Sequence, residues 1–85
     1  MIKYYVYVLK SLRDGKRYTG ITNDLERRIR DHNYGKNSST KSRRPFKIVY
    51  YECFVNKIDA FNRERYLKTG WGRKHLRHAL VNTLK

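Results

Sequence analysis

The chain has 85 residues and carries 21 Lys and Arg against 7 Asp and Glu, a formal net charge of +14. A chain of this length buries only about 60% of its unfolded surface, so we expect one domain over residues 1–85. Such a surface repels itself unless a polyanion binds it, and nucleic acid is the expected partner.

The same features argue against several classes of protein. No apolar run approaches the roughly 18 residues of a spanning helix, and the start of the chain lacks a signal-peptide core, so we expect a cytoplasmic protein. The basic residues run from Lys3 to Lys85 rather than along one amphipathic helix, which disfavours membrane binding. Cys53 lies in an apolar run, which predicts a buried, inert thiol.

The first elements in chain order form a predicted β-hairpin. Residues 3–9 and 16–22 are rich in β-branched and aromatic side chains, and Asp14-Gly15 between them is a strong turn signal. A helix is predicted next over residues 24–34, because Asn23 can cap its start and Gly35 can end it.

The period of this helix separates its basic residues into two faces. With 100° per residue, Arg28 and His32 fall on the same side as Leu25 and Ile29, whereas the other arginines of the helix point away from it. We therefore expect Arg28 and His32 to face the body of the protein.

Residues 36–45 are polar and basic without periodicity, which predicts a mobile loop that contacts phosphate. Residues 46–54 make a third strand, expected beside the hairpin. The basic residues that we expect to contact nucleic acid, in this loop and later in the chain, are Lys36, Lys41, Arg43, Arg44, Lys68, Arg73 and Lys74.

A second helix is predicted from Asn56 to Gly70, and its period places Glu64 among apolar residues. Trp71 follows as an expected packing anchor. A third helix then carries leucines at helical spacing, at positions Leu76, Leu80 and Leu84.

Four segments form a recognisable combination: Tyr5-Val6-Tyr7, Tyr18-Thr19-Gly20, the helix at 24–33 and the stretch at 60–68. Together they resemble the GIY-YIG endonuclease superfamily, and most of all its short, single-domain bacterial members of the UPF0213 type. The resemblance covers residues 3 to about 70.

The resemblance implies an α+β domain with a three-stranded antiparallel sheet flanked by about three helices. It also implies metal-dependent hydrolysis of DNA phosphodiester bonds, in a role such as structure-selective cleavage in DNA repair or recombination. We expect low sequence selectivity, because phosphate contacts position a protein without reading bases. Carried over by position, the site residues are Tyr7, Tyr18, Gly20, Arg28, His32 and Glu64.

These roles agree with the chemistry of phosphodiester hydrolysis. Glu64 would hold Mg²⁺ or Mn²⁺, and a lone carboxylate leaves the ion mostly hydrated. Tyr18 or Tyr7 would take a proton from the attacking water, which requires nearby positive charge because a free phenol has a pKa of about 10. Arg28 can bind the phosphate through two nitrogens, and His32 could relay a proton or orient a tyrosine.

Each site residue also has a structural interpretation. The tyrosines could pack in the sheet, Gly20 could only permit a close approach of the backbone, and Glu64 could be an i,i+4 partner of Lys68. His75 and His78 have no other metal-ligating residue near them in sequence, so we expect them to contact solvent or phosphate.

The chain also departs from the family pattern. Tyr5 and Thr19 replace the glycine and the isoleucine of the name, while Ile21 and Leu76 stand where many relatives have a lysine and an asparagine. These last two favour an alternative, a non-catalytic nucleic-acid-binding module with the same fold. A basic protein-interaction domain is a third interpretation, and we expect a monomer or a weak homodimer.

Overall fold

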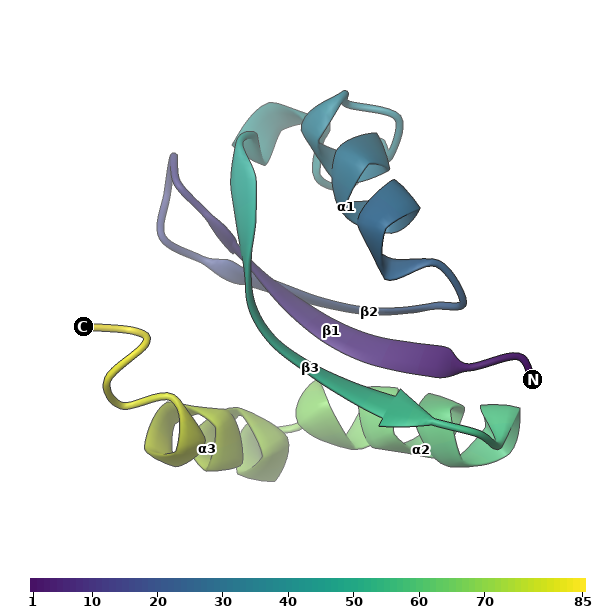
Figure 1. Ribbon diagram of the computed structural model, residues 1–85. Coiled ribbons are helices and arrows are strands. Elements are labelled where there is room, and N and C mark those ends of the chain that lie inside the picture. The colour runs from purple at the N-terminus through teal and green to yellow at the C-terminus, as the bar shows by residue number, and fades with distance from the viewer.

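A computed structural model describes all residues from 1 to 85, and it contains one sheet with helices on both faces (Figure 1). The predicted α+β fold is confirmed. In chain order the elements are β1 (Tyr4–Ser11), β2 (Arg17–Thr22), α1 (Leu25–Asn33), a short 3₁₀ helix (Lys41–Arg43), β3 (Phe46–Phe54), α2 (Lys57–Leu67) and α3 (Gly70–Ala79).

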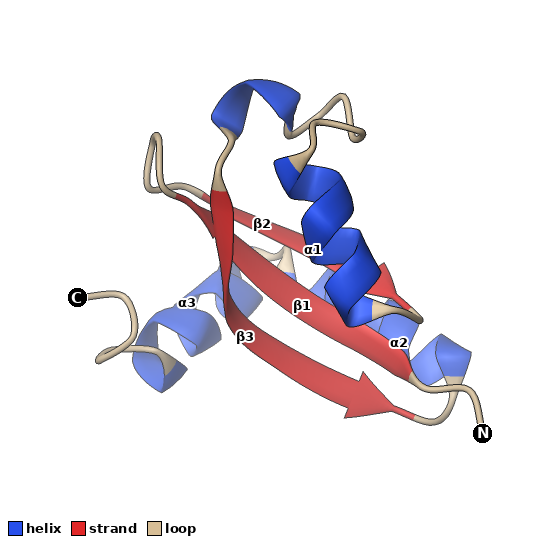
Figure 2. Cartoon of the chain, turned by 45° about the horizontal axis from the view of Figure 1, so that its top comes forward, coloured by secondary structure: helices blue, strands red, loops and turns tan.

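The sheet has the order β2-β1-β3, and β1 pairs antiparallel with both neighbours. Side chains of β1 alternate between the two faces, as the pleat requires. Val6 and Val8 pack on one side in a core with residues of α2 and α3, whereas Tyr7 and Leu9 pack on the other side with Phe46 and residues of α1. The views agree, since α1 lies over one face and the other two helices cover the opposite face (Figures 1 and 2).

Side-chain caps set the starts of the helices. The Asp24 carboxylate accepts a hydrogen bond from the backbone N–H of Arg27, so α1 is capped one residue later than predicted. Gly35, with φ of 78°, follows the end of this helix as expected. Thr69 caps α3 through the N–H of Gly72, so that helix begins at Gly70.

Two predictions about single residues are wrong. Cys53 is exposed, because it lies on β3 at the edge of the sheet, where one face of the strand is left uncovered. Trp71 is 74% exposed and does not anchor the core, because it lies in the first turn of α3 on the solvent side, with Lys74 beside its ring. No helix of the structure has the length and apolar character needed to cross a membrane.

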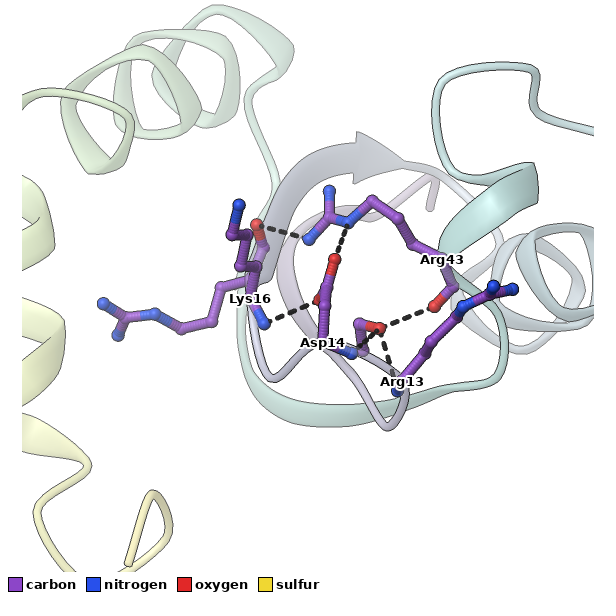
Figure 3. A network of polar contacts seen from close by, with 6 residues as sticks. Arg13, Asp14, Lys16 and Arg43 are labelled. Atoms are coloured by element: carbon purple, nitrogen blue, oxygen red, sulfur yellow. Dashed lines mark hydrogen bonds and ion pairs between the residues drawn. The ribbon is translucent and has the colours of Figure 1, made fainter.

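The segment 36–45 is anchored to the domain, which does not fit the prediction of a mobile loop. Thr40 is fully buried. The Ser11 hydroxyl donates to the carbonyl of Arg43 at 2.6 Å, and the Arg43 side chain reaches the Asp14 carboxylate in the hairpin turn at 3.1 Å (Figure 3). The predicted turn at Asp14-Gly15 therefore also holds this loop.

Candidate active site

The pairing of β1 with β2 brings the two motif tyrosines together. Tyr7 lies opposite Gly20, Tyr18 lies opposite Leu9, and the two tyrosine rings are 6.5 Å apart between centroids. A Cβ atom at position 20 would collide with the Tyr7 phenol. The glycine therefore leaves the space that the Tyr7 ring occupies.

A chain of hydrogen bonds starts at Arg28 and passes through Tyr7. The Arg28 Nε–H donates to the Tyr7 oxygen at 3.3 Å, and that hydroxyl lies 2.9 Å from His32 Nε2. On the other side of its ring, His32 Nδ1 lies 2.8 Å from the Thr40 hydroxyl, which donates to the carbonyl of Asn37 at 3.4 Å. Tyr7, His32 and Thr40 are fully buried.

The groups at the two ends of this series of hydrogen bonds determine which atom donates and which accepts at each step. Because Tyr7 accepts from Arg28, its own O–H is free to donate to His32 Nε2, and Nδ1–H then donates to Thr40. Burial and the nearby Arg28 guanidinium lower the pKa of His32, so the ring is neutral near pH 7. A neutral imidazole is the form that accepts from Tyr7.

Burial raises the pKa of the Tyr7 phenol, and this effect outweighs the hydrogen bond and the charge of Arg28. The Tyr7 phenol therefore lacks the lowered pKa that a proton acceptor near neutral pH requires. Tyr18 is half-buried, and its ring lies 4.9 Å from the His32 ring between centroids. Of the two tyrosines, Tyr18 is the one that can meet a water molecule.

Glu64 reaches the site from the other face of the sheet. It lies on α2, which contacts the edge strand β2, and it is only 8% exposed, as its phase predicted. Its carboxylate is near enough to the Tyr7 phenol to contribute to the raised pKa of that group. Lys68 Nζ lies 2.8 Å from Glu64 Oε2, so the predicted i,i+4 partner is present too.

The donor set sets limits on the metal that this site could hold. The structure has no group of three or more His, Cys, Asp or Glu arranged for a metal ion. Lys68 bonds Glu64 through Oε2 alone, which leaves Oε1 as a hard oxygen donor. One carboxylate oxygen fits a Mg²⁺ or Mn²⁺ ion that keeps most of its water, and it does not fit a fully dehydrated ion.

Beside Tyr18 is a pocket of about 580 Å³ between the hairpin, the end of α2 and α3, and no acidic residue lines it. Three of the basic residues predicted to contact nucleic acid are there: Arg43, Lys68 and Arg73. The other four, Lys36, Lys41, Arg44 and Lys74, lie outside it, and Lys36 pairs with Asp31 at 3.6 Å.

Three residues of this region could not be predicted from the sequence. Lys16 and Arg17 line the pocket, and Thr40 supports His32. The sequence positions of Lys16 and Arg17 show no pattern that distinguishes them from other charged residues on the surface. Thr40 lies in a run of serines and threonines, where nothing in the sequence marks one hydroxyl as buried.

Ile21 and Leu76, which replace polar residues of the family pattern, are part of the core. Leu76 is 2% exposed, and Ile21 packs against the same cluster on the α2 side of the sheet. Neither position brings a polar group to the site.

Comparisons with known proteins show which family the chain resembles. A family model described as the GIY-YIG catalytic domain matches residues 3–77. The chain is 47% identical over 72 residues to a UPF0213 protein of Bacillus pumilus, covering 84% of this chain and 71% of that protein. It is 44% identical over 78 residues to UPF0213 protein SSP2268 of Staphylococcus saprophyticus, covering 91% and 94%.

A solved structure gives the same result for the fold. The solution NMR structure of UPF0213 protein BH0048 from Bacillus halodurans matches with a TM-score of 0.54 and 36% identity, over 88% of this chain and 82% of that one. The resemblance inferred from the motifs is confirmed.

The lowered pKa of His32 predicts that stability depends on pH. The unfolded chain takes up a proton at this residue near pH 6.5, before the folded protein does, so the free energy of unfolding should fall as the pH drops below about 6.5. Urea unfolding between about pH 7 and pH 5 should show this fall in the wild type and a smaller one in His32→Gln. Equal slopes in the two proteins would contradict a buried, neutral His32.

Proposed function

The chain belongs to the GIY-YIG family, and on this premise we propose that it is a metal-dependent endonuclease that hydrolyses DNA phosphodiester bonds with low sequence selectivity. The observation that carries the proposal is the hydrogen-bonded cluster of Tyr7, Arg28 and His32 next to Tyr18. Packing alone does not require an arginine, a phenol and an imidazole to share one contact network.

Tyr18 is assigned to the attacking water. It is half-buried, whereas Tyr7 is fully buried and has a phenol of raised pKa. Arg28 interacts electrostatically with both tyrosines, and its guanidinium has nitrogens left to bind the scissile phosphate through a second hydrogen bond. The water, the phosphate and the Tyr18 oxygen can then meet at the edge of β2.

Tyr7 and His32 are positioning residues in this mechanism. Tyr7 holds the Arg28 side chain, His32 holds Tyr7, and Thr40 holds His32. Because all three supporting groups are buried, the Arg28 guanidinium is fixed before substrate arrives, which reduces the cost of ordering it in the transition state.

Glu64 is the residue that would hold the metal ion. When bound there, Mg²⁺ or Mn²⁺ would supply Lewis-acid stabilisation of negative charge on the leaving oxygen. Lys68 is paired with this carboxylate and borders the pocket, so it adds a cation for the substrate backbone.

Low selectivity is consistent with the residues that surround the pocket. Its polar side chains are largely Lys and Arg, which contact phosphate and position a protein on DNA without reading base sequence. The cations come from the hairpin, from the anchored loop and from the two helices α2 and α3.

One observation favours the alternative, a nucleic-acid-binding module without turnover. Ile21 and Leu76 bring no polar group to the site, and Lys68 already occupies one oxygen of Glu64. A protein with these features could bind DNA through the pocket and cleave it slowly or not at all.

Substitution of Glu64 separates the two functions. With Mg²⁺ or Mn²⁺, the wild type should nick supercoiled plasmid, and Glu64→Gln should lower the rate on the order of 10²–10³-fold while DNA binding stays unchanged. Glu26→Gln, a change of an exposed carboxylate on α1, is the matched control and should nick normally. Absence of metal-dependent cleavage of any DNA by the wild type would support the binding module.

The two tyrosines should respond differently to loss of the hydroxyl. Tyr18→Phe should lower the cleavage rate by about 10²–10⁴-fold without loss of stability, since it removes only the proton acceptor. Tyr7→Phe leaves His32 Nε2 and Arg28 Nε without their buried partner and should lower the free energy of unfolding by about 1–3 kcal/mol. Single-turnover cleavage and urea unfolding measure the two effects. A fully active Tyr18→Phe would contradict the assignment.

A further inference from the structure

A second hollow adjoins the first pocket and lies between the hairpin, the end of α3 and the residues that follow this helix. It has a volume of about 350 Å³, and it shares Gly15 and Arg17 with the first pocket. Its other polar side chains are Lys10 and Arg77, and no acidic residue lines it. The two hollows therefore form one cationic path from Tyr18 across the start of β2 to α3.

Arg17 lies at the junction of the two hollows. Its NH1 atom is the only buried side-chain nitrogen or oxygen in the chain that has no hydrogen-bond partner. A buried donor without a partner costs about 1–3 kcal/mol, and nearly all such groups in native proteins are paired. An anion that enters either hollow at Arg17 would supply the acceptor.

The basic residues around this junction are also without counter-charges. The four ion pairs of the structure use Lys36, Arg43, Arg63 and Lys68. None involves the four cations at the junction, which are Lys10, Arg17, Arg73 and Arg77. Lys10 lies directly opposite Arg17 in the β1–β2 pairing, an arrangement of like charges that destabilises a sheet.

Arg73 and Arg77 add to this repulsion from the helix. They are one turn apart on α3, and together with burial their charges lower the pKa of Arg17. An anion that binds between these cations would reduce the electrostatic repulsion among them.

We propose that Arg17, Arg73 and Arg77 form a second phosphate site, which binds a backbone phosphate of the same DNA strand away from the scissile one. The site deepens the proposed function, because it would direct the strand from Tyr18 past the hairpin turn and along α3. Its ligand is a phosphodiester in a polymer, since the cations continue through two connected hollows that exceed the reach of a single phosphate group.

Arg77 gives the clearest test because it is exposed on α3 and lines the second hollow, which no residue of the catalytic cluster lines. The probe is a fluorescein-labelled DNA duplex, whose binding is followed by anisotropy without metal, in a Glu64→Gln background that prevents cleavage. Arg77→Ala should weaken binding and lower the slope of log Kd against log salt by about one. Arg77→Lys should retain most of the slope.

Lys57→Ala is the matched control, since it removes the same charge from an exposed position at the start of α2, and that end of the helix is the one away from α3 (Figure 1). Its salt slope should equal that of the parent protein. Inorganic phosphate at the same concentration of phosphate groups should displace little DNA if the ligand is a strand. Equal slopes for Arg77→Ala and Lys57→Ala, or full displacement by inorganic phosphate, would overturn the proposal.

The outcome is independent of cleavage. If the wild type never cuts DNA but Arg77→Ala loses one unit of salt slope, the nuclease proposal fails and the second phosphate site stands. If cleavage is normal and Arg77→Ala binds DNA like the control, the second phosphate site is refuted and the nuclease proposal stands.

Discussion

The hydrogen bond between Tyr7 and His32, 2.9 Å long and fully buried, is the constraint on which the site depends. It joins the middle of the central strand to α1, and loss of either partner would leave a polar atom in the core. Because both groups are held, the Arg28 side chain on the same helix has a fixed partner at the sheet. The geometry of the site is thus set by core packing rather than by flexible surface groups.

This hydrogen bond also gives the two tyrosines different roles. Tyr7 is in the core and acts through the groups that it holds, while Tyr18 lies at the edge of the sheet beside the pocket. The edge strand β2 is the place where the two faces meet: α1 contributes from one face, and α2 contributes Glu64 from the other (Figure 2). The site therefore draws on helices that lie on opposite faces of the sheet.

Much of this arrangement could be predicted from the sequence. The hairpin, the three helices and the inward phase of Arg28, His32 and Glu64 follow from periodicity and turn residues, and the structure agrees. Contacts between distant segments could not be predicted in the same way. The anchoring of Arg43 on Asp14 depends on a loop path that leaves no local signal. Exposure of Cys53 depends on which strand lies at the edge of the sheet, and apolar runs do not specify this.

The direction of the buried hydrogen-bond chain is the central claim, and the tautomer of His32 tests it most directly. Nitrogen-15 NMR of the imidazole side chains near pH 7 reports which ring nitrogen carries the proton. The account predicts a neutral His32 ring protonated at Nδ1, with Nε2 accepting from Tyr7. A ring protonated at Nε2, or an imidazolium at that pH, would contradict it.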